Sequence, residues 1–383
     1  MSRTEARAAY ESLPIPDTTE EHWRFTNLRG FDPEAFTGAG STEISTLLDL
    51  DVAGYATVTA DGIDISKAPE GVTFELLSEE DERLYSLVGW DEKFAAHNAA
   101  MWKHGLLVRV PKGLQLEKPL YVRIAVTGQT FWRLVVVAEE GARASLIEEY
   151  ASPAPDTAAY SNAVTELFVE PNAKLEYVSL QNLSTETWHF ANHHARVERD
   201  GELDWVAGGF GSKKGKTRIQ NDLNGRGATS RVTGAYFGDG EQHLDYDTFQ
   251  KHIAPDCESD FAFKGALRDH ATVVWRGMIR VEPDAQKTNA YQECRNLMLS
   301  PTAHAVPIPG LEIMANDVRC THGATVGRVD AEQLFYLMSR GLSRPEAKRL
   351  IVRGFFQDVL DRIELEPVRD AVTAALEARI PQA

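Results

Sequence analysis

The chain has 383 residues, of which 43% are hydrophobic and 25% are charged, and its formal net charge is −17. This length allows one large domain or two to three smaller ones with a substantial core. The acidity argues against nucleic-acid binding and against binding to anionic membranes, because both need clustered Lys and Arg. No run of about 18 apolar residues predicts a membrane span. The N-terminus lacks a secretory signal, so we expect a cytoplasmic protein.

The three cysteines are too few and too unevenly spaced for a disulfide framework. In a reducing cytosol they would remain thiols that are open to metals and oxidants. The sequence contains no P-loop motif and no nucleophile elbow, so we expect a protein that is not an enzyme and does not hydrolyse ATP itself. The Gly/Lys-rich stretch 208–217 lacks the phosphate-binding spacing and is interpreted as a solvated loop.

Residues 1–100 are predicted to form a mixed, mostly helical cap. The helical patterns cover 3–13, Glu79–Val88 and Lys93–Met101. A further segment, Thr18–Leu28, begins with an N-cap-type residue and carries Trp23 and Phe25 as aromatic anchors.

From Gly105 the pattern changes to short runs rich in β-branched and aromatic residues. A loose repeat then consists of a strand, a polar turn and an alternating strand, at 136–150, 168–182, 196–210 and 222–236. One such unit cannot bury its own inner face, so the repeat predicts a stacked β-solenoid over residues 101–329. A β-sandwich remains the alternative. The alternation places four side chains inside: Leu175, Tyr177, Leu203 and Trp205.

Residues 330–383 have a helical period and are predicted to form a helical domain. Ala331–Ser339 has apolar residues on one side, and Gly341 is a plausible stop. Ser343 and Glu346 form a capping box for a helix that should end near Arg362. A last helix is expected from Pro367 to about Arg379.

The segment Gln286–Gly327 gathers Cys294, Cys320 and His322 in a Pro/Gly-broken stretch. Cys294 and His322 are 28 residues apart, about one turn of the expected solenoid, so the thiolate and the imidazole could approach each other or one iron. The alternative for Cys294 is a small buried residue. Cys320 and His322 are two residues apart and should share one face of a strand, pointing to the core or to a partner.

Other histidines and the third cysteine have weaker signals. His189, His193 and His194 would bind a metal only on a helix or a tight loop, because on a strand they point to opposite faces. His243 and His252 are interpreted as structural histidines. Cys257 has no second ligand nearby in the sequence, and its role is left open.

The C-terminal half resembles the SufB/SufD scaffold family of iron–sulfur cluster assembly, strongly from about residue 234 to residue 363 and only thinly before about residue 100. The matching motifs are QxTxxxQ (Gln286, Thr288, Gln292), NLxLS (Asn296–Ser300), PGLEI (Pro309–Ile313), DVxCxHGATVG (Asp317–Gly327), LFYLMSRGL (Leu334–Leu342) and EAKRLIVRGF (Glu346–Phe355).

The resemblance implies a right-handed parallel β-helix with helical ends, acting as a non-catalytic scaffold. CxHGATVG is similar to the SufD branch, whereas SufB-type chains have acidic residues where Thr321 and Gly323 stand here. The family implies that Cys320 and His322 lie at the seam with a SufB-like subunit or a second copy. Cys294 aligns with an acceptor cysteine of SufB-type chains that SufD-type chains usually lack.

The resemblance further implies that a SufC-like ATPase docks on the C-terminal helices. The candidate docking residues are Leu334, Phe335, Tyr336, Leu350 and Phe355. No tightly bound cofactor is expected, only a transient iron–sulfur cluster, for which His322 and Cys294 are candidate ligands. A β-helix carbohydrate-active enzyme is the alternative function.

Overall fold

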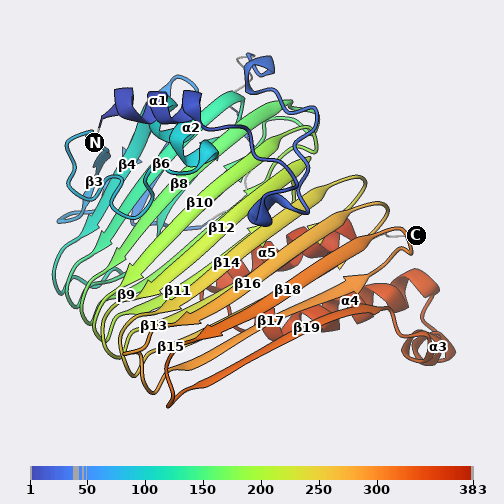
Figure 1. Ribbon diagram of the computed structural model, residues 1–383. Coiled ribbons are helices and arrows are strands. Elements are labelled where there is room, and N and C mark those ends of the chain that lie inside the picture. The colour runs from blue at the N-terminus through green and yellow to red at the C-terminus, as the bar shows by residue number, and fades with distance from the viewer. Residues whose placement is uncertain (1, 38–42, 45–46, 49, 381–383) are drawn as a thin grey trace.

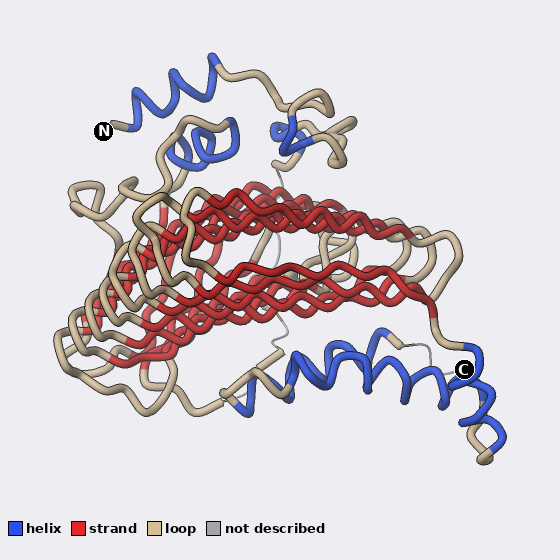
Figure 2. Tube along the Cα trace, turned by 60° about the horizontal axis from the view of Figure 1, so that its bottom comes forward, coloured by secondary structure: helices blue, strands red, loops and turns tan. Residues whose placement is uncertain are grey.

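The computed structural model describes residues 2–37, 43–44, 47–48 and 50–380. Two long sheets lie face to face and form a parallel β-solenoid, with helices on both outer faces (Figures 1 and 2). The predicted solenoid is therefore confirmed, and the sandwich alternative is wrong, because the strands of successive turns pair in parallel.

Each turn of the solenoid contributes one strand to each sheet. One sheet has, in spatial order, β19 (Arg319–Arg328), β17 (Asn289–Met298), β15 (Glu258–Leu267), β13 (Thr229–Gly238), β11 (Glu202–Gly209), β9 (Lys174–Asn182), β7 (Arg143–Ala151), β5 (Leu120–Ala125), β1 (Gly54–Thr59) and β2 (Gly62–Lys67). The other has β18 (His304–Ile313), β16 (Thr272–Val281), β14 (His243–His252), β12 (Lys214–Leu223), β10 (Trp188–Val197), β8 (Ala159–Val169), β6 (Gly128–Ala138), β4 (His104–Val110) and β3 (Thr73–Leu76).

A repeated corner explains how the sequence makes the turns. A residue with positive φ follows the first strand of successive turns, as at Gly141, Asn172, Asp200 and Asp256. Gly, Asn and Asp adopt this left-handed conformation at the lowest cost. The backbone N–H of each corner residue donates to a carbonyl of the next turn, for example Asn172 to Arg199 (2.9 Å). The polar turns of the sequence repeat are these corners.

The space between the sheets is a continuous core that is mainly apolar and also encloses polar side chains such as Glu148 and Gln292. Leu175, Tyr177, Leu203 and Trp205 are all buried in it, as the alternation predicted. The parallel register continues this pattern, because it sets Leu203 against Leu175 and Trp205 against Tyr177 on neighbouring strands. Each turn thus covers the apolar inner face of the turn before it.

The N-terminal region is less helical than expected. Its described residues form two α-helices, α1 (Arg3–Ser12) and α2 (Lys93–Met101), and two 3-10 helices, η1 (Glu21–Trp23) and η2 (Pro33–Ala35). The strands β1, β2 and β3 also lie within residues 1–100, and they extend the sheets at one end with antiparallel pairs.

The predicted helix Glu79–Val88 is wrong, because this segment is a series of turns in which Tyr85 has φ 63°. The buried carboxylate of Glu166 accepts hydrogen bonds from the backbone N–H groups of Tyr85, Leu87 and Val88. Those donors are therefore satisfied without a helix.

The C-terminal region forms α3 (Ala331–Ser339), α4 (Arg344–Leu360) and α5 (Glu366–Arg379). The Ser343/Glu346 capping box is present. Helices α4 and α5 cover the outer face of the sheet that contains β13 and β15, whereas α3 projects beyond the sheets (Figures 1 and 2). The C-terminal region therefore consists of one helical layer packed on the solenoid, α4 and α5, and one short helix, α3, that extends from it.

Candidate functional site at the open end of the solenoid

The solenoid ends at β18 and β19, which we call the open end. Among the described residues, β19 pairs only with β17, and β18 pairs only with β16. Along the first part of β17, buried side chains alternate with more exposed ones, whereas most side chains of β19 are exposed. Four large apolar residues are exposed here: Leu311, Ile313, Met314 and Val326. An unpaired edge with apolar side chains is typical of a surface that another chain covers.

The backbone directions distinguish the two strands of the open end. Arg319 N donates to Thr288 O (2.8 Å), so odd-numbered residues of β19 donate to β17 and even-numbered ones point their N–H groups to the free edge. In β18, His304 N donates to Ala271 O, so the odd-numbered residues face the free edge there. Pro307 and Pro309 lie at such positions and have no N–H to donate. The free edge of β19 therefore has backbone N–H donors at each outward-facing residue, whereas the free edge of β18 lacks them at Pro307 and Pro309.

Cys320 and His322 share one face of β19, as predicted. They pair with Ala290 and Gln292, which are both buried inside the solenoid. The side chains of Cys320 and His322 therefore lie on the same, inward-facing side of the sheet, at its last strand. Cys320 is half-buried against the apolar cluster of Ile279, and burial raises the pKa of its thiol. His322 is exposed. The His322 imidazole is thus accessible at the open end, and the Cys320 thiol lies two residues away on the same face of β19.

Cys294 lies one strand deeper and is fully buried. Its Sγ is 3.4 Å from the Tyr236 hydroxyl and accepts a hydrogen bond from Asn296 Nδ2 at 3.3 Å. Burial raises the pKa of this thiol to about 11, so it is protonated near neutral pH. In this state Cys294 fits the structural alternative, a small buried residue with satisfied polar contacts.

The predicted stacking of Cys294 with His322 is wrong in register. Cys294 pairs with Ala324, and His322 pairs with Gln292. The strands β17 and β19 start 30 residues apart, at Asn289 and Arg319, rather than 28. The two side chains share a face but are displaced by two positions along neighbouring strands. Within the described residues, no group of three or more His, Cys, Asp or Glu is placed to hold a metal ion.

The C-terminal helices hold the candidate docking residues in two different environments. Phe335 (74% exposed), Tyr336 (55%) and Leu350 (50%) are accessible, whereas Leu334 is buried. Phe355 is half-buried beneath the Lys264 ammonium, which lies 4.9 Å from its ring centroid. A groove of about 480 Å³ between α3 and α4 is lined by Tyr336, Leu350 and their neighbours. We call this groove, with Phe335, the α3–α4 surface.

Comparison with known proteins agrees with this architecture. A family model described as the SufBD core domain of the SUF system for iron–sulfur cluster assembly matches residues 123–355, which is more than half of the chain. The chain belongs to the SufBD family. The resemblance seen in the motifs is therefore confirmed.

Several SufBD relatives align with most of the chain. The iron–sulfur cluster assembly SufBD family protein of Mycobacterium bovis is 30% identical over 378 residues, covering 96% of this chain and 90% of the relative. That of Mycobacterium leprae is 29% identical over 96% of this chain and 91% of the relative. That of Staphylococcus saprophyticus is 31% identical over 72% of this chain and 60% of the relative. This is a SufBD-family iron–sulfur cluster assembly protein.

The other histidines and the third cysteine of this SufBD chain have structural partners. His189 and His193 point inside the solenoid, where burial lowers their pKa values to about 4 and about 3. His194 lies on the outer side, 3.0 Å from Asp222. His252 contacts Ser259 at 2.8 Å. The Cys257 thiol donates to Gly225 O at 3.2 Å.

The stretch 208–217 is not a solvated loop: it comprises the end of β11, a short turn and the start of β12. Lys216 is buried in it and forms an ion pair with Asp245 at 2.7 Å. His243 accompanies this pair, with Nε2 2.9 Å from the Thr26 hydroxyl. No helix of the described residues is long and apolar enough to span a bilayer.

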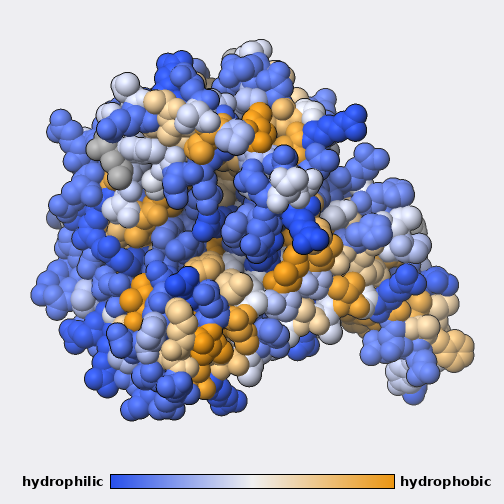
Figure 3. Space-filling view, in the orientation of Figure 1, coloured by the Kyte–Doolittle hydropathy of each residue, from blue (hydrophilic) through white to orange (hydrophobic). Residues whose placement is uncertain are grey.

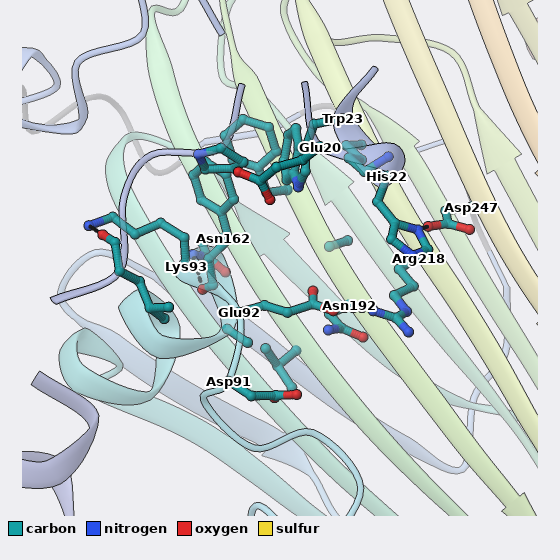
Figure 4. Close-up of a pocket in the computed structure, with 18 of the residues that line it drawn as sticks. Glu20, His22, Trp23, Asp91, Glu92, Lys93, Asn162, Asn192, Arg218 and Asp247 are labelled. Atoms are coloured by element: carbon teal, nitrogen blue, oxygen red, sulfur yellow. Dashed lines mark hydrogen bonds and ion pairs between the residues drawn. The ribbon is translucent and has the colours of Figure 1, made fainter. Parts of the chain in front are cut away.

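A cavity of about 470 Å³ lies on the outer face of the sheet that contains β8, β10, β12 and β14, and the sequence analysis did not predict it. Its lining comes from residues that are far apart in the chain, such as Trp23, Phe94, Phe190 and Asp247 (Figure 4). Only the aromatic residues of the Thr18–Leu28 segment could have pointed to it, and they were interpreted as anchors.

Proposed function

We propose that this chain is a non-catalytic, SufD-like scaffold subunit whose open end pairs with a second scaffold chain, either a SufB-like subunit or another copy. The observation that carries the proposal is the unpaired, exposed edge of β19, with Cys320 and His322 on it. At the opposite end the two sheets finish in the short strands β2 and β3, which pair antiparallel with β1 and β4. Among the described residues, the edge strands of ten residues are β18 and β19, both at the open end.

In this proposal the partner adds a strand to β19. The even-numbered residues of β19 have free N–H groups for such a strand, and Pro307 and Pro309 make β18 the poorer template. Exposed Val326, Leu311 and Ile313 supply apolar area around the new pairing. The C-x-H-G-A-T-V-G sequence of β19 supports the SufD-like assignment over a SufB-like one.

The seam is then where iron and sulfide are assembled as cargo. Imidazole and thiolate are both ligands of iron–sulfur clusters. His322 is accessible and Cys320 lies beside it, but the described residues of this chain do not complete a ligand set. The remaining ligands would come from the partner scaffold. Cys294 would take part only after β19 moves, because its thiol is buried and protonated.

A SufC-like ATPase is the second partner, docked on the α3–α4 surface. Phe335, Tyr336 and Leu350 expose apolar area on the projecting helix and its neighbour. ATP would bind to that partner alone. Helix α4 is also fixed to the solenoid, since Lys264 donates to Phe355 O (2.8 Å). Nucleotide-driven movement of the ATPase therefore has a physical route to the sheets, provided that it binds the two states differently.

Replacement of His322 tests the role of the seam. We expect His322→Ala to lower the iron and sulfide content of the purified complex without dissociating it, because the side chain is exposed. His270→Ala, at another exposed histidine, is the control. Unchanged iron and sulfide in His322→Ala would remove this residue from the mechanism.

The alternative function, a β-helix carbohydrate-active enzyme, rested on the solenoid alone. The family match favours the scaffold.

A further inference from the structure

The cavity on the outer face of the β8–β14 region lies away from the open end and from the α3–α4 surface. Its volume of about 470 Å³ is within the range of roughly 300–1,000 Å³ that is usual for small-molecule sites. Strands β8, β10, β12 and β14 form its floor, and residues from the N-terminal segment and the start of α2 form its walls (Figure 4). We call it the N-terminal cavity.

Aromatic side chains from the floor and the walls of the N-terminal cavity pack against one another. Phe94 and Phe190 stack with ring centroids 4.0 Å apart, and Trp23 lies 5.2 Å from Phe94. Phe190 is 3% exposed and Asn162 is 2% exposed, so the cavity ends on buried side chains. The Asn162 Nδ2 atom donates to Phe94 O at 2.9 Å. Its Oδ1 accepts no hydrogen bond from any described residue, which leaves one acceptor at the floor.

The cationic groups that line the cavity are all occupied. Lys93 Nζ donates to the carbonyls of Tyr10 (2.6 Å) and Leu13 (2.7 Å). Lys216 is paired with Asp245, outside the lining, and Arg218 with Glu92. An anionic ligand would have to displace one of these partners.

The carboxylates are in excess. The lining has five of them, Glu20, Glu21, Asp91, Glu92 and Asp247, against the three cations Lys93, Lys216 and Arg218. Glu21 is paired with Arg276, and Asp247 contacts His22 at 2.7 Å. Glu20 and Asp91 have no ion-pair partner among the described residues, and Figure 4 shows them on opposite walls of the cavity. The unpaired charge of the lining is therefore negative and lies on these two exposed carboxylates, which we call the mouth of the N-terminal cavity.

We propose that the N-terminal cavity binds a small organic cation, an amine with an aromatic or aliphatic body. The body would lie against Trp23, Phe94 and Phe190, and the ammonium group would lie near Glu20 and Asp91. Carboxylates and aromatic faces together are the groups that recognise alkylammonium ions in proteins. This proposal does not depend on the scaffold function.

Three indole probes of similar size test the sign of the charge that the site prefers. Tryptamine is cationic, tryptophol is neutral and indole-3-propionate is anionic. By isothermal titration at low salt, we expect saturable 1:1 binding of tryptamine by the full chain and weaker binding of the other two. Raising the salt concentration should weaken tryptamine binding, because the carboxylates at the mouth are exposed.

Neutralising the mouth locates the site. Glu20→Gln combined with Asp91→Asn should weaken tryptamine about fivefold, the effect of two exposed carboxylates. Glu241→Gln, at an exposed carboxylate outside the cavity lining, should leave the affinity unchanged. Three results would each overturn the proposal: no saturable tryptamine binding, equal or tighter binding of indole-3-propionate, or an unchanged affinity in the double variant.

Discussion

The two cysteines of the candidate site differ at the residue scale in how their thiols are held. Cys294 is enclosed by Tyr236 and Asn296 with a pKa of about 11, whereas Cys320 is half-buried on the last strand. A thiol reacts as its thiolate, and only when a reagent reaches it.

We therefore predict that alkylation of the isolated native chain at pH 8 modifies Cys320 before Cys294 and before the buried Cys257. Mass spectrometry of peptides after timed iodoacetamide treatment measures the order, and the urea-denatured chain should show all three modified at similar rates. Equal alkylation rates of Cys294 and Cys320 in the folded chain would contradict the burial of the Cys294 thiol.

The buried histidines predict how stability depends on pH. Burial lowers the pKa of His189 from 6.5 to about 4. Between these pH values the unfolded chain binds a proton that the folded chain does not. The contribution of the neutral His189 to the free energy of unfolding is therefore complete above pH 6.5 and is lost as the pH falls towards 4. The slope for one such group is about 1.4 kcal/mol per pH unit.

His189→Gln removes this titration. We expect its thermal midpoint to fall less between pH 6.5 and pH 5 than that of the natural chain, as measured by calorimetry. His270→Gln, at an exposed histidine, should keep the natural slope. If His189→Gln retains the full pH dependence, the imidazole is not held neutral inside the solenoid.

At the scale of elements, the C-terminal helices divide into a packed layer and a projecting one. Val352, Phe356 and Val372 are buried against the sheet, whereas α3 exposes Phe335 and Tyr336. The lower right of Figure 3, where Figure 1 places α3, shows hydrophobic atoms among hydrophilic ones. Apolar residues that the fold does not use are the ones that a partner can use.

We predict that Phe335→Ser combined with Leu350→Ser abolishes co-purification of a SufC-like ATPase and leaves the thermal midpoint of the chain within a few degrees of its natural value. Ile15→Ser removes an exposed apolar side chain elsewhere and should retain the ATPase. Retention of the ATPase by the double variant would move the docking site away from α3 and α4.

The elements also show what the sequence could and could not predict. Alternation placed Leu175 and Trp205 inside correctly, because the side-chain period of a strand depends only on the local backbone. The segment Glu79–Val88 looked helical, but the distant Glu166 carboxylate binds its N–H groups. Tertiary contacts of this kind have no local signal.

The sequence predicted the part of the candidate site that depends on local spacing, but not the part that depends on the register between distant strands. The shared face of Cys320 and His322 follows from a two-residue spacing on one strand. The register of Cys294 depends on the lengths of both corners of the last turn, and a turn of 30 rather than 28 residues moves its neighbour from His322 to Ala324. The N-terminal cavity joins four strands and two N-terminal segments, so no stretch of sequence contains it.

For the molecule as a whole, the central claim is that the free edge of β19 pairs with a second scaffold chain. Ala324 is an even-numbered residue of that strand, so its N–H points away from β17. Ala324→Pro removes this donor and obstructs an added strand, but it keeps the pairing with β17, since proline is tolerated at such edge positions.

The most direct measurement is the amount of a SufB-like chain, or of a differently tagged copy of this chain, that co-purifies with Ala324→Pro at an unchanged thermal midpoint. The account predicts that the partner is lost while the variant stays folded. Full recovery of the partner with the variant would contradict pairing at the open end.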